Sequence, residues 1–294
     1  MATVSSGSTS ERFGFIQRYR ELGVKGLCDW LGVSTTGFYD WEKRPPSEHY
    51  LHDQRLLKLI TKIYWQHQGC YGSPRVYKTL KKQGVRVGEK RVERLMREAG
   101  LVGKAAIGLK KKPGLRRFRS SGENLLKDLA APTSINQVWV GDVTYLKVSG
   151  KWRYLATVMD VYSRRILGWS LSKTRSTELT CAALGYALKK RAYPKGVLFH
   201  TDRGVEYMGC EYQKLLNNYD FRHSVNRPGC CTDNAFMESF YHTLKGEKIR
   251  GKIFRSTSEL RRAISNYINK YYNSIRLHTG INDMSPIEYE RCLA

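Results

Sequence analysis

Three carboxylates, Asp142, Asp202 and Glu238, have the residue types and surroundings of a metal site. Asp142 lies inside the alternating apolar stretch VWVGDVTYLKV (138–148). A carboxylate on the inward face of such a stretch is costly unless a partner or a cation neutralises it. Asp202 ends the short apolar stretch VLFHTD (197–202), and sites form where strands end in open α/β sheets. Glu238 lies on a predicted amphipathic helix, away from its apolar face.

The chemistry open to these carboxylates is metal-assisted phosphoryl transfer. Three carboxylates repel one another unless hard cations lie between them, and an all-oxygen ligand set suits Mg²⁺, which Mn²⁺ can replace. Two such ions about 3.5–4 Å apart activate the attacking oxygen and stabilise the leaving oxygen of an in-line displacement. The three residues are therefore predicted to be the catalytic residues and the ligands of two Mg²⁺ ions.

The elements that must position these residues follow a regular order. Alternating and β-branched segments predict strands, and segments with apolar residues every three or four positions predict helices. The predicted order begins with three strands, over 138–148, 151–162 and 164–172, and a helix over 177–190. A strand over 197–202, a helix over 211–218, a strand over 221–225 and a helix from about 233 follow. This order predicts an α/β fold with a mixed five-stranded sheet and flanking helices.

The region before the sheet is predicted to be all-helical. Residues 11–31 have helical periodicity, and GLCDWLGVSTTGFYDWEK (26–43) gives a helix, a Gly-Val turn, an N-cap serine and a second helix. This pattern is typical of a helix-turn-helix motif, with a plain helical hairpin as the alternative. The candidate DNA contacts on its second helix are Thr35, Thr36 and Tyr39.

A second helical unit follows, with helices expected over 56–64, 73–82 and 90–99. On the last of these helices Arg91 and Arg94 begin an arginine stripe with spacing three, opposite an apolar face. We predict that the stripe contacts DNA, although a solvated helix face is the simpler alternative.

Positive charge is distributed along the whole chain. The net charge is +25 at pH 7, and both halves are basic, since residues 1–130 hold 26 basic and 12 acidic residues. Residues 104–119 contain seven Lys or Arg and no acid, which predicts a basic linker that follows phosphates. Its candidate contacts are Lys110, Lys111, Lys112, Arg116 and Arg117. This balance favours a polyanionic partner.

The seven cysteines have no CxxC spacing, which indicates a reducing, cytoplasmic setting. His49, His52 and Cys70 have part of the spacing of an HHCC zinc module, but no second cysteine follows at the required distance. No apolar run approaches the roughly 20 residues that span a bilayer, and no signal peptide is evident. We therefore expect a soluble protein without a membrane partner.

The spacing of the carboxylates resembles a known pattern. Thirty-five residues separate Asp202 from Glu238, as in the D,D(35)E arrangement of retroviral integrases and insertion-sequence transposases. The segments WVGDVTYL, HTDRGVEY, NRPGCCTDNAFMESFYHTLKGE and YYNSIRLHTGINDMSPIEYE resemble the second-reading-frame protein of two-frame bacterial insertion sequences. The resemblance covers roughly residues 12–290, and the predicted order of elements resembles the ribonuclease-H-like integrase core.

The resemblance implies a DNA transposase that cuts and joins strands at the ends of an insertion sequence. It implies double-stranded DNA as partner, both the terminal repeats and the target, with a homo-oligomer assembled on that DNA. It also implies a circular intermediate and a fusion with the first-frame protein, and a bacterial location at the nucleoid. The alternatives are a ribonuclease-H-like nuclease without joining activity and a non-catalytic regulator that binds the element ends.

Two basic residues are further candidates for DNA contact. Lys245 follows Glu238 by seven residues, which is about 700° of helix, so it shares the face of the carboxylate. A solvated lysine, paired with Glu247 or free, is the alternative. The resemblance places Arg276 near the site, where its guanidinium can grip a phosphate.

Other titratable residues were weighed for the site. Asp160 is expected to cap a hairpin turn and Asp233 to cap a helix, while Glu206 and Glu247 match no metal-binding position of the family. His200 shares a strand face with Asp202, and His242 lies one turn beyond Glu238, so substrate contact remains open for both.

The expected domain boundaries follow from these assignments. They are a disordered leader over 1–10, a helix-turn-helix DNA-binding region over 11–103, a basic linker over 104–130, the catalytic core over 131–255 and a helical C-terminal extension over 256–294.

Overall fold

The computed structural model describes residues 7–104, 123–126, 129–227 and 231–293. It divides into two compact units, Met1–Thr61 and Lys62–Ala294. The predicted linker contacts Lys110, Lys111, Lys112, Arg116 and Arg117 lie outside the described residues. No described helix is long and apolar enough to cross a membrane.

The first unit is built from short helices around a small apolar core. The helices are α2 (Thr9–Arg18), the 3₁₀ helix η1 (Arg20–Leu22), α3 (Val24–Leu31), α4 (Thr35–Lys43) and the first part of α5 (Glu48–Gln66). The side chains buried at the centre are Phe13, Ile16, Cys28, Leu31 and Phe38. They recur at helical spacing, so each helix has one apolar face turned inward.

The first helices differ from the sequence prediction in two ways. Ser8 caps α2 in a reciprocal capping box with Glu11, whose carboxylate accepts from the Ser8 N–H at 2.7 Å. The prediction of a disordered leader over 1–10 is therefore wrong for residues 8–10. The helical stretch predicted over 11–31 is divided into α2, η1 and α3. The last division falls at Gly23, whose φ of 97° is readily adopted only by glycine.

The turn between α3 and α4 is the one predicted from the sequence. Gly32 ends α3 in the left-handed conformation, with φ 63°, and the hydroxyl of Ser34 accepts the Gly37 N–H at 3.3 Å as the N-cap of α4. Tyr39 and Thr36 on α4 are exposed. The motif therefore presents the side chains that were predicted to contact DNA.

The second unit starts with a helical region that holds the end of α5. Its other helices are α6 (Ser73–Lys82) and α7 (Glu89–Glu98), close to the predicted bounds, whereas α5 begins at Glu48 rather than at residue 56. Val92, Leu95 and Met96 form the buried face of α7. Arg91 and Arg94 are half-buried, and Arg94 forms an ion pair with Glu98 at 3.1 Å.

A five-stranded mixed sheet forms the centre of the second unit. Its strands are β1 (Val138–Val148), β2 (Lys151–Asp160), β3 (Ile166–Ser172), β4 (Leu198–Thr201) and β5 (Arg222–Val225), in the spatial order β3-β2-β1-β4-β5. The first three strands form an antiparallel meander, and β4 and β5 run parallel to β1. This is the ribonuclease-H-like arrangement that the order of elements predicted.

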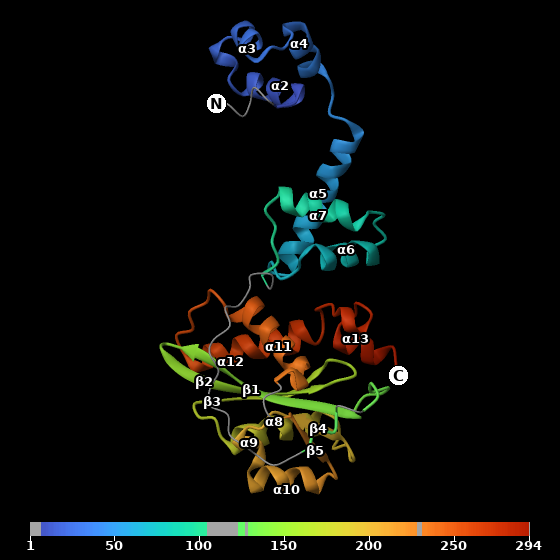
Figure 1. Ribbon diagram of the computed structural model, residues 1–294, viewed down its shortest axis with the longest axis vertical. Coiled ribbons are helices and arrows are strands. Elements are labelled where there is room, and N and C mark those ends of the chain that lie inside the picture. Colours follow the sequence, from blue (N-terminus) through green and yellow to red (C-terminus); the bar gives the residue numbers. More distant parts are fainter. Residues whose placement is uncertain (1–6, 105–122, 127–128, 228–230, 294) are drawn as a thin grey trace. The chain divides into compact units, whose positions relative to one another are not determined.

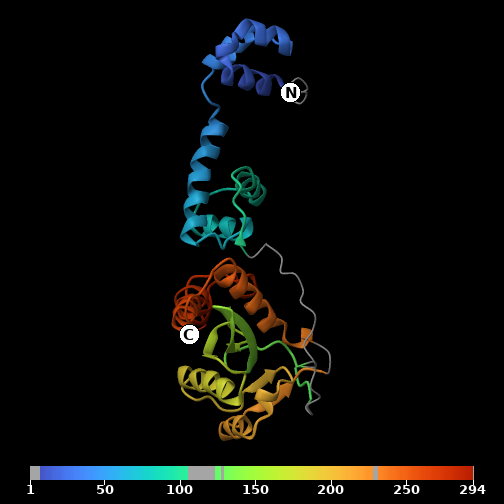
Figure 2. The same cartoon turned by 90° about the vertical axis from the view of Figure 1, so that its left-hand side faces the viewer.

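Helices cover both faces of this sheet (Figures 1 and 2). On one face lie α8 (Thr177–Lys190), α9 (Val205–Met208) and α10 (Cys210–Asn218), and on the other lie α11 (Ala235–Leu244), α12 (Thr257–Ser265) and α13 (Pro286–Arg291). Alternate residues of β1 enter the two cores, with Val138 and Val140 on the α11 side and Trp139 on the α8 side. The period of two seen in the sequence therefore corresponds to the alternation of β1 residues between the two cores.

The C-terminal region packs in the same domain as the sheet. Leu260, Ile264, Ile268 and Tyr272 are buried in the same core as β1 and α11, so the extension expected over 256–294 is an integral layer of the fold. In this region α12 is followed directly by a π-helix. The remaining short elements are η3 (Cys231–Asn234), the π-helices η4 (Lys245–Ile249) and η5 (Asn266–Tyr272), and η6 (Thr279–Ile281).

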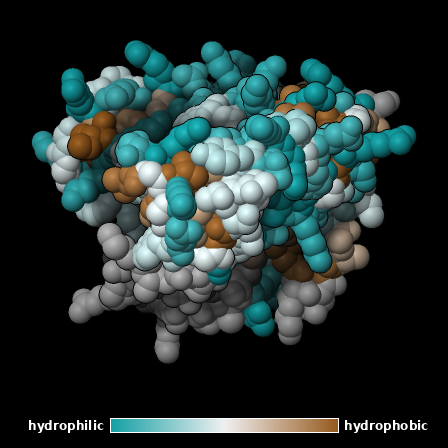
Figure 3. Space-filling view, turned by 90° about the horizontal axis from the view of Figure 1, so that it is seen from above, coloured by the Kyte–Doolittle hydropathy of each residue, from teal (hydrophilic) through white to brown (hydrophobic). Residues whose placement is uncertain are grey.

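The surface agrees with the high charge of the chain. On the face shown in Figure 3 hydrophilic side chains predominate, and hydrophobic ones form small separate groups.

Candidate active site

Asp142 lies in the middle of β1, next to β4, which ends one residue before Asp202. The parallel register pairs Val140 with His200, so the same offset brings Asp142 beside Asp202 at the carboxyl end of β4. The Asp142 carboxylate accepts the Val143 N–H at 2.7 Å. Burial, followed by the negative charge of Asp202, raises the pKa of Asp142 well above its usual range. A cation at this point relieves both causes.

Asp202 lies in the turn between β4 and α9 and is half-buried. Burial and then the charge of Glu206 raise the pKa of Asp202, while the Gly204 N–H, which donates to its Oδ1 at 3.0 Å, lowers it. Two carboxylates with raised pKa values, adjacent in space but distant in sequence, form a site at which negative charge is concentrated.

The structure adds two residues that the sequence analysis did not select. Glu206 is buried, and its Oε1 accepts from Nε of Arg175 at 2.6 Å. Nη2 of the same guanidinium lies 3.6 Å from Oδ2 of Asp202. Arg175 follows β3 in a loop without periodicity, so the only signal in the sequence was the closeness of Glu206 to Asp202.

Glu238 lies on the exposed side of α11, as predicted from the apolar face of that helix. The helix is anchored to β1, since the Tyr241 hydroxyl donates to the Asp142 carbonyl at 2.5 Å and the Asn234 amide donates to the Gly141 carbonyl at 3.0 Å. Within the described ranges, no three His, Cys, Asp or Glu side chains are close enough together to hold a metal ion. The structure therefore brings together two of the three predicted carboxylates.

The rival acids have structural roles in this fold. Asp160 caps the turn after β2, as expected, because its Oδ1 accepts the N–H groups of Tyr162 and Ser163 at 2.9 and 3.1 Å. Asp233 was expected to cap α11, but the N-cap is Asn234. Asp233 instead forms an ion pair with Arg227 at 2.8 Å. The hydrogen bonds from Arg227 hold the pKa of Asp233 well below the usual range of a carboxyl group, so it is ionised at neutral pH.

The two histidines that were left open differ in their surroundings. His200 is fully buried, and its ring nitrogens lie 2.8 Å from the Ser224 hydroxyl and 2.7 Å from the Asn226 amide oxygen. It therefore joins β4 to β5 and to the loop that follows. His242 is exposed on α11.

Arg276 is placed differently from its predicted phosphate contact. It is 3% exposed, and its Nη2 donates to Oε1 of Glu247 at 2.9 Å. The other carboxylate oxygen of Glu247, Oε2, accepts from the Tyr267 hydroxyl at 2.8 Å. In this structure the guanidinium is held in a buried ion pair and is not exposed for the phosphate contact that was predicted.

Lys245 is half-buried at the start of π-helix η4. Its Nζ lies 4.8 Å from the centre of the Tyr145 ring on β1, within range of a cation–π interaction. Glu247, the alternative partner of Lys245, forms an ion pair with Arg276. Lys245 therefore lies beside the strand that carries Asp142.

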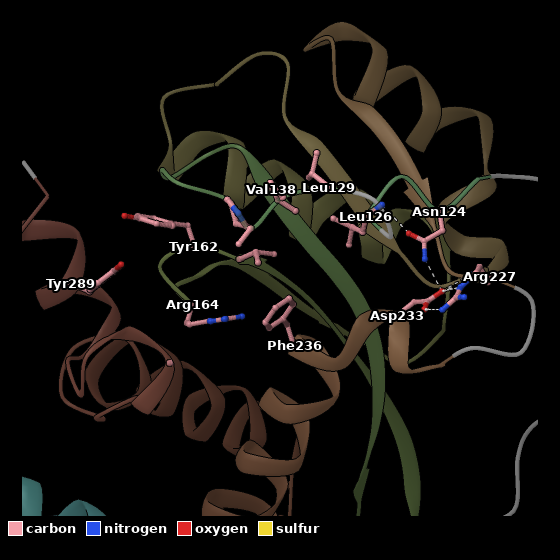
Figure 4. A pocket seen from close by; sticks show the side chains of 15 residues that line it. Asn124, Leu126, Leu129, Val138, Tyr162, Arg164, Arg227, Asp233, Phe236 and Tyr289 are labelled. Carbon is pink, nitrogen blue, oxygen red and sulfur yellow. Dashed lines mark hydrogen bonds and ion pairs between the residues drawn. The ribbon is translucent and has the colours of Figure 1, made fainter.

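A pocket of about 580 Å³ lies at another part of this unit. It is lined by the start of β1, the turn after β2, the start of α11 and Tyr289, and by none of the three predicted carboxylates. Figure 4 shows the Arg164 side chain along the ring of Phe236 and the ion pair of Arg227 and Asp233 at one end. The candidate site is therefore separate from this pocket.

Comparisons with known proteins agree with this architecture. Residues 132–231 and 238–292 match families described as integrase core domains, and residues 51–106 match a family described as an HTH-like domain. Transposase InsF for insertion sequence IS3A of Escherichia coli (strain K12) is 36% identical over 286 residues, which cover 95% of this chain and 98% of that protein. An uncharacterized 31 kDa protein of insertion element IS600 from Shigella sonnei is 34% identical over 90% of this chain and 97% of its own length.

Among solved structures, the HTLV-2 integrase catalytic core domain in complex with magnesium has a TM-score of 0.37 at 17% identity, and covers 53% of this chain and 96% of its own. The simian T-cell lymphotropic virus intasome has a TM-score of 0.42 at 14% identity, with 79% and 74% covered.

The fold and the domain matches define a transposase with an integrase-type core. The identity over nearly the full length goes further: the chain belongs to the transposases of the IS3 family of insertion sequences. It is a DNA transposase and binds DNA.

Proposed function

We propose that this transposase cuts and joins DNA at the ends of its insertion sequence by metal-dependent phosphoryl transfer, with Asp142, Asp202 and Glu238 as metal ligands. The observation that carries the proposal is the adjacency of Asp142 and Asp202. Burial raises the pKa values of both carboxyl groups, followed by the charge of Asp202 for Asp142 and by the charge of Glu206 for Asp202. An all-oxygen set of this kind fits a hard divalent cation. Glu238 is the third ligand, because it lies one helical turn before Tyr241, which contacts the backbone of Asp142.

Asp142, Asp202 and Glu238 would hold two Mg²⁺ or Mn²⁺ ions, and such ions would supply activation of the attacking oxygen and stabilisation of the leaving oxygen. The protein holds the carboxylates in place through the β1–β4 register and through the contacts of Tyr241 and Asn234. In the first reaction water attacks a phosphodiester, a P–O bond forms and another breaks, and a 3′ hydroxyl is released. In the second, that hydroxyl attacks a target strand in the same manner.

DNA recognition is proposed to be divided among several regions. Thr35, Thr36 and Tyr39 on α4 read the terminal repeats, and Arg91 and Arg94 on α7 add contacts. The basic segment with Lys110, Lys111, Lys112, Arg116 and Arg117 binds phosphates of terminal and target DNA, as does Lys245 beside β1. A homo-oligomer on DNA and fusion to the first-frame protein, both implied by the resemblance, complete the proposed assembly, and its place is the nucleoid.

The test of the metal site is a strand-transfer assay with the full chain and a duplex carrying the terminal repeat of its element. Asp142→Asn, Asp202→Asn and Glu238→Gln should each lower strand transfer by orders of magnitude, since each removes a metal ligand, while binding of the terminal duplex persists. Matched controls are Asp220→Asn and Glu211→Gln, whose side chains are 70% and 75% exposed. These should transfer at the wild-type rate.

Asp142→Asn has a second expected effect, on stability. Because its pKa is raised in the fold, the ionised carboxylate destabilises the metal-free protein above pH 3.8, its reference pKa. The amide should therefore raise the melting temperature at pH 7 to 8 by about 2–4 °C per kcal/mol relieved, and the gain should shrink as pH falls. Added Mn²⁺ should stabilise the wild-type protein against unfolding but not the Asp142→Asn variant. Near wild-type transfer by any ligand variant would contradict the proposal, and cleavage without joining would indicate a nuclease.

A further inference from the structure

Arg175 and Glu206 lie beside the two aspartates but have no role in the site as proposed. Arg175 is in the loop between β3 and α8, and Glu206 is in α9. Nε and Nη2 of the guanidinium lie 2.6 and 2.5 Å from the same oxygen, Oε1 of Glu206. The longer separation of 3.6 Å between Nη2 and Oδ2 of Asp202 is an ion pair without a hydrogen bond.

Glu206 is fixed in this position by its surroundings. Its side chain is 1% exposed, and the Thr180 hydroxyl donates to its carbonyl at 2.9 Å, which ties α9 to α8. A Cβ atom at Gly204 would lie 2.5 Å from Oε1 of Glu206, so the glycine leaves room for the carboxylate. Glu206 is therefore a rigid acceptor that faces Arg175.

Arg175 itself is open to the outside. Its side chain is 39% exposed, and its contacts with the described residues use Nε and Nη2. A guanidinium has five N–H donors in a planar fork, so the N–H groups of Nη1 remain available for an oxygen acceptor. An arginine that a buried carboxylate orients in this way binds a phosphate with little loss of side-chain entropy.

We propose that Arg175 binds a DNA phosphate next to the carboxylates, and that Glu206 is the residue that positions it. The weak ion pair with Asp202 is exchanged when metal and DNA enter, because the Asp202 carboxylate then faces a divalent cation. The guanidinium keeps its two bonds to Glu206 and turns Nη1 to the phosphate. The inference rests on the proposed metal site for its place in the reaction, but phosphate binding by Arg175 is measurable without catalysis.

A charge argument gives the first measurement. Arg175 neutralises part of the negative charge around Asp202, so Arg175→Gln should bind Mn²⁺ about threefold tighter or more, by calorimetry. Glu206→Gln should lower the Mn²⁺ affinity or leave it unchanged. Lys173→Gln is the matched control, since Lys173 is an exposed cation in the same loop, and it should leave Mn²⁺ affinity unchanged.

The second measurement locates the phosphate. Duplexes that carry the terminal repeat, with one neutral methylphosphonate at successive positions, are bound to the full chain in Ca²⁺ so that no cleavage occurs. Wild-type protein and Lys173→Gln should lose about 10- to 100-fold in affinity at one position close to the cleaved bond. Arg175→Gln should bind the unmodified duplex about 10- to 100-fold more weakly than the wild type does. A methylphosphonate at that position should then cause no further loss of affinity in this variant.

The variants also separate positioning from folding. Glu206→Gln should show reduced sensitivity at the same phosphate, because Arg175 is no longer held. The double variant Arg175→Gln/Glu206→Gln leaves no unpaired buried carboxylate, so it keeps the test valid if Arg175→Gln alone fails to fold. Asp142→Asn should keep full methylphosphonate sensitivity while losing transfer.

Two results would overturn the assignment. One is an Arg175→Gln or double variant that folds and remains as sensitive as the wild type at every methylphosphonate position. The other is a decrease in Mn²⁺ affinity in Arg175→Gln. Active Asp142→Asn would overturn the metal site instead, whatever the phosphate pattern.

Discussion

The buried pair of Arg276 and Glu247 shows how the role of a charged residue depends on what faces it. Arg276 lies in the C-terminal part of the chain, in a segment that resembles the transposase family. That resemblance predicted a phosphate as the partner of Arg276. In the fold the partner is Glu247, with the Tyr267 hydroxyl on the other carboxylate oxygen. The ion pair raises the pKa of Arg276 further above its already high value, so its charge is permanent.

We predict that Arg276→Gln and Glu247→Gln each lower stability by about 3–5 kcal/mol, because each leaves a buried charge without its partner. The melting temperature should fall by about 2–4 °C for each kcal/mol. The double variant Arg276→Met/Glu247→Leu should lose less than the sum of the single variants.

Lys270→Gln is the control for this pair, since Lys270 is an exposed cation on η5. The salt dependence of DNA binding by folded Arg276→Gln should equal that of the wild type. A slope reduced by about 0.9 would instead show that Arg276 contacts a phosphate.

At the scale of elements, α4 is held as a recognition helix should be. Phe38 points into the core of the first unit while Tyr39 and Thr36 are exposed. We predict that Tyr39→Ala and Thr36→Ala lower the preference for terminal repeats over random duplex by about 1–3 kcal/mol, since contacts with base edges carry specificity. Competition binding at fixed salt measures this preference.

The control for α4 is Ser34→Ala, which removes its N-cap. It should lower the stability of the first unit by about 1 kcal/mol and leave discrimination unchanged in the folded protein. If the α4 variants lost affinity equally for terminal and random DNA, another element would be the one that recognises the sequence.

Elements with a strong period were predicted well from the sequence. The bounds of β1 and α8 match the prediction, because alternation over 138–148 and helical periodicity over 177–190 each identify one type of element. The four-residue helix α9 was missed, since it is only about one helical turn long and a period is visible only over several turns. The C-terminal helices were found but taken as an extension, because periodicity gives the apolar face of a helix and not the surface on which that face packs.

The candidate site was predictable to the extent that its residues lie on such elements. Asp142 and Asp202 are adjacent because β1 and β4 are neighbours in the sheet, which the order of elements implied. Arg175 and Glu206 depend on how the loop before α8 meets α9, and no local pattern encodes that contact. The exposed position of Glu238 followed from the apolar face of α11.

At the scale of the whole second unit, several histidines have lowered pKa values, among them the buried His200 and the half-buried His223 and His278. Burial lowers the pKa of His200, lowers that of His223 to about 4 and lowers that of His278 to about 2. The unfolded chain takes up a proton at each histidine below about pH 6.5, whereas the folded unit does not. The contribution of these histidines to the free energy of unfolding is therefore fully present above pH 6.5, and it is lost as the pH falls toward 4.

We predict that His223→Gln reduces the slope of unfolding free energy against pH by about 1.4 kcal/mol per pH unit between pH 6 and pH 4.5. Urea unfolding at several pH values measures the slope. The control is His242→Gln, because His242 is exposed, and its slope should equal that of the wild type. An unchanged slope in His223→Gln would mean that His223 is protonated in the folded protein.

The packing of α12 and η5 against the sheet has a consequence for synthesis on the ribosome. The strands end at Val225, but Leu260, Ile264 and Tyr272, which cover one face of them, are translated later. At about 5–20 residues per second, a nascent chain exposes this apolar face for several seconds. A chain that stops early never covers it, so copies of the gene shortened at the 3′ end should yield products that chaperones and proteases remove, and not folded competitors of the intact transposase.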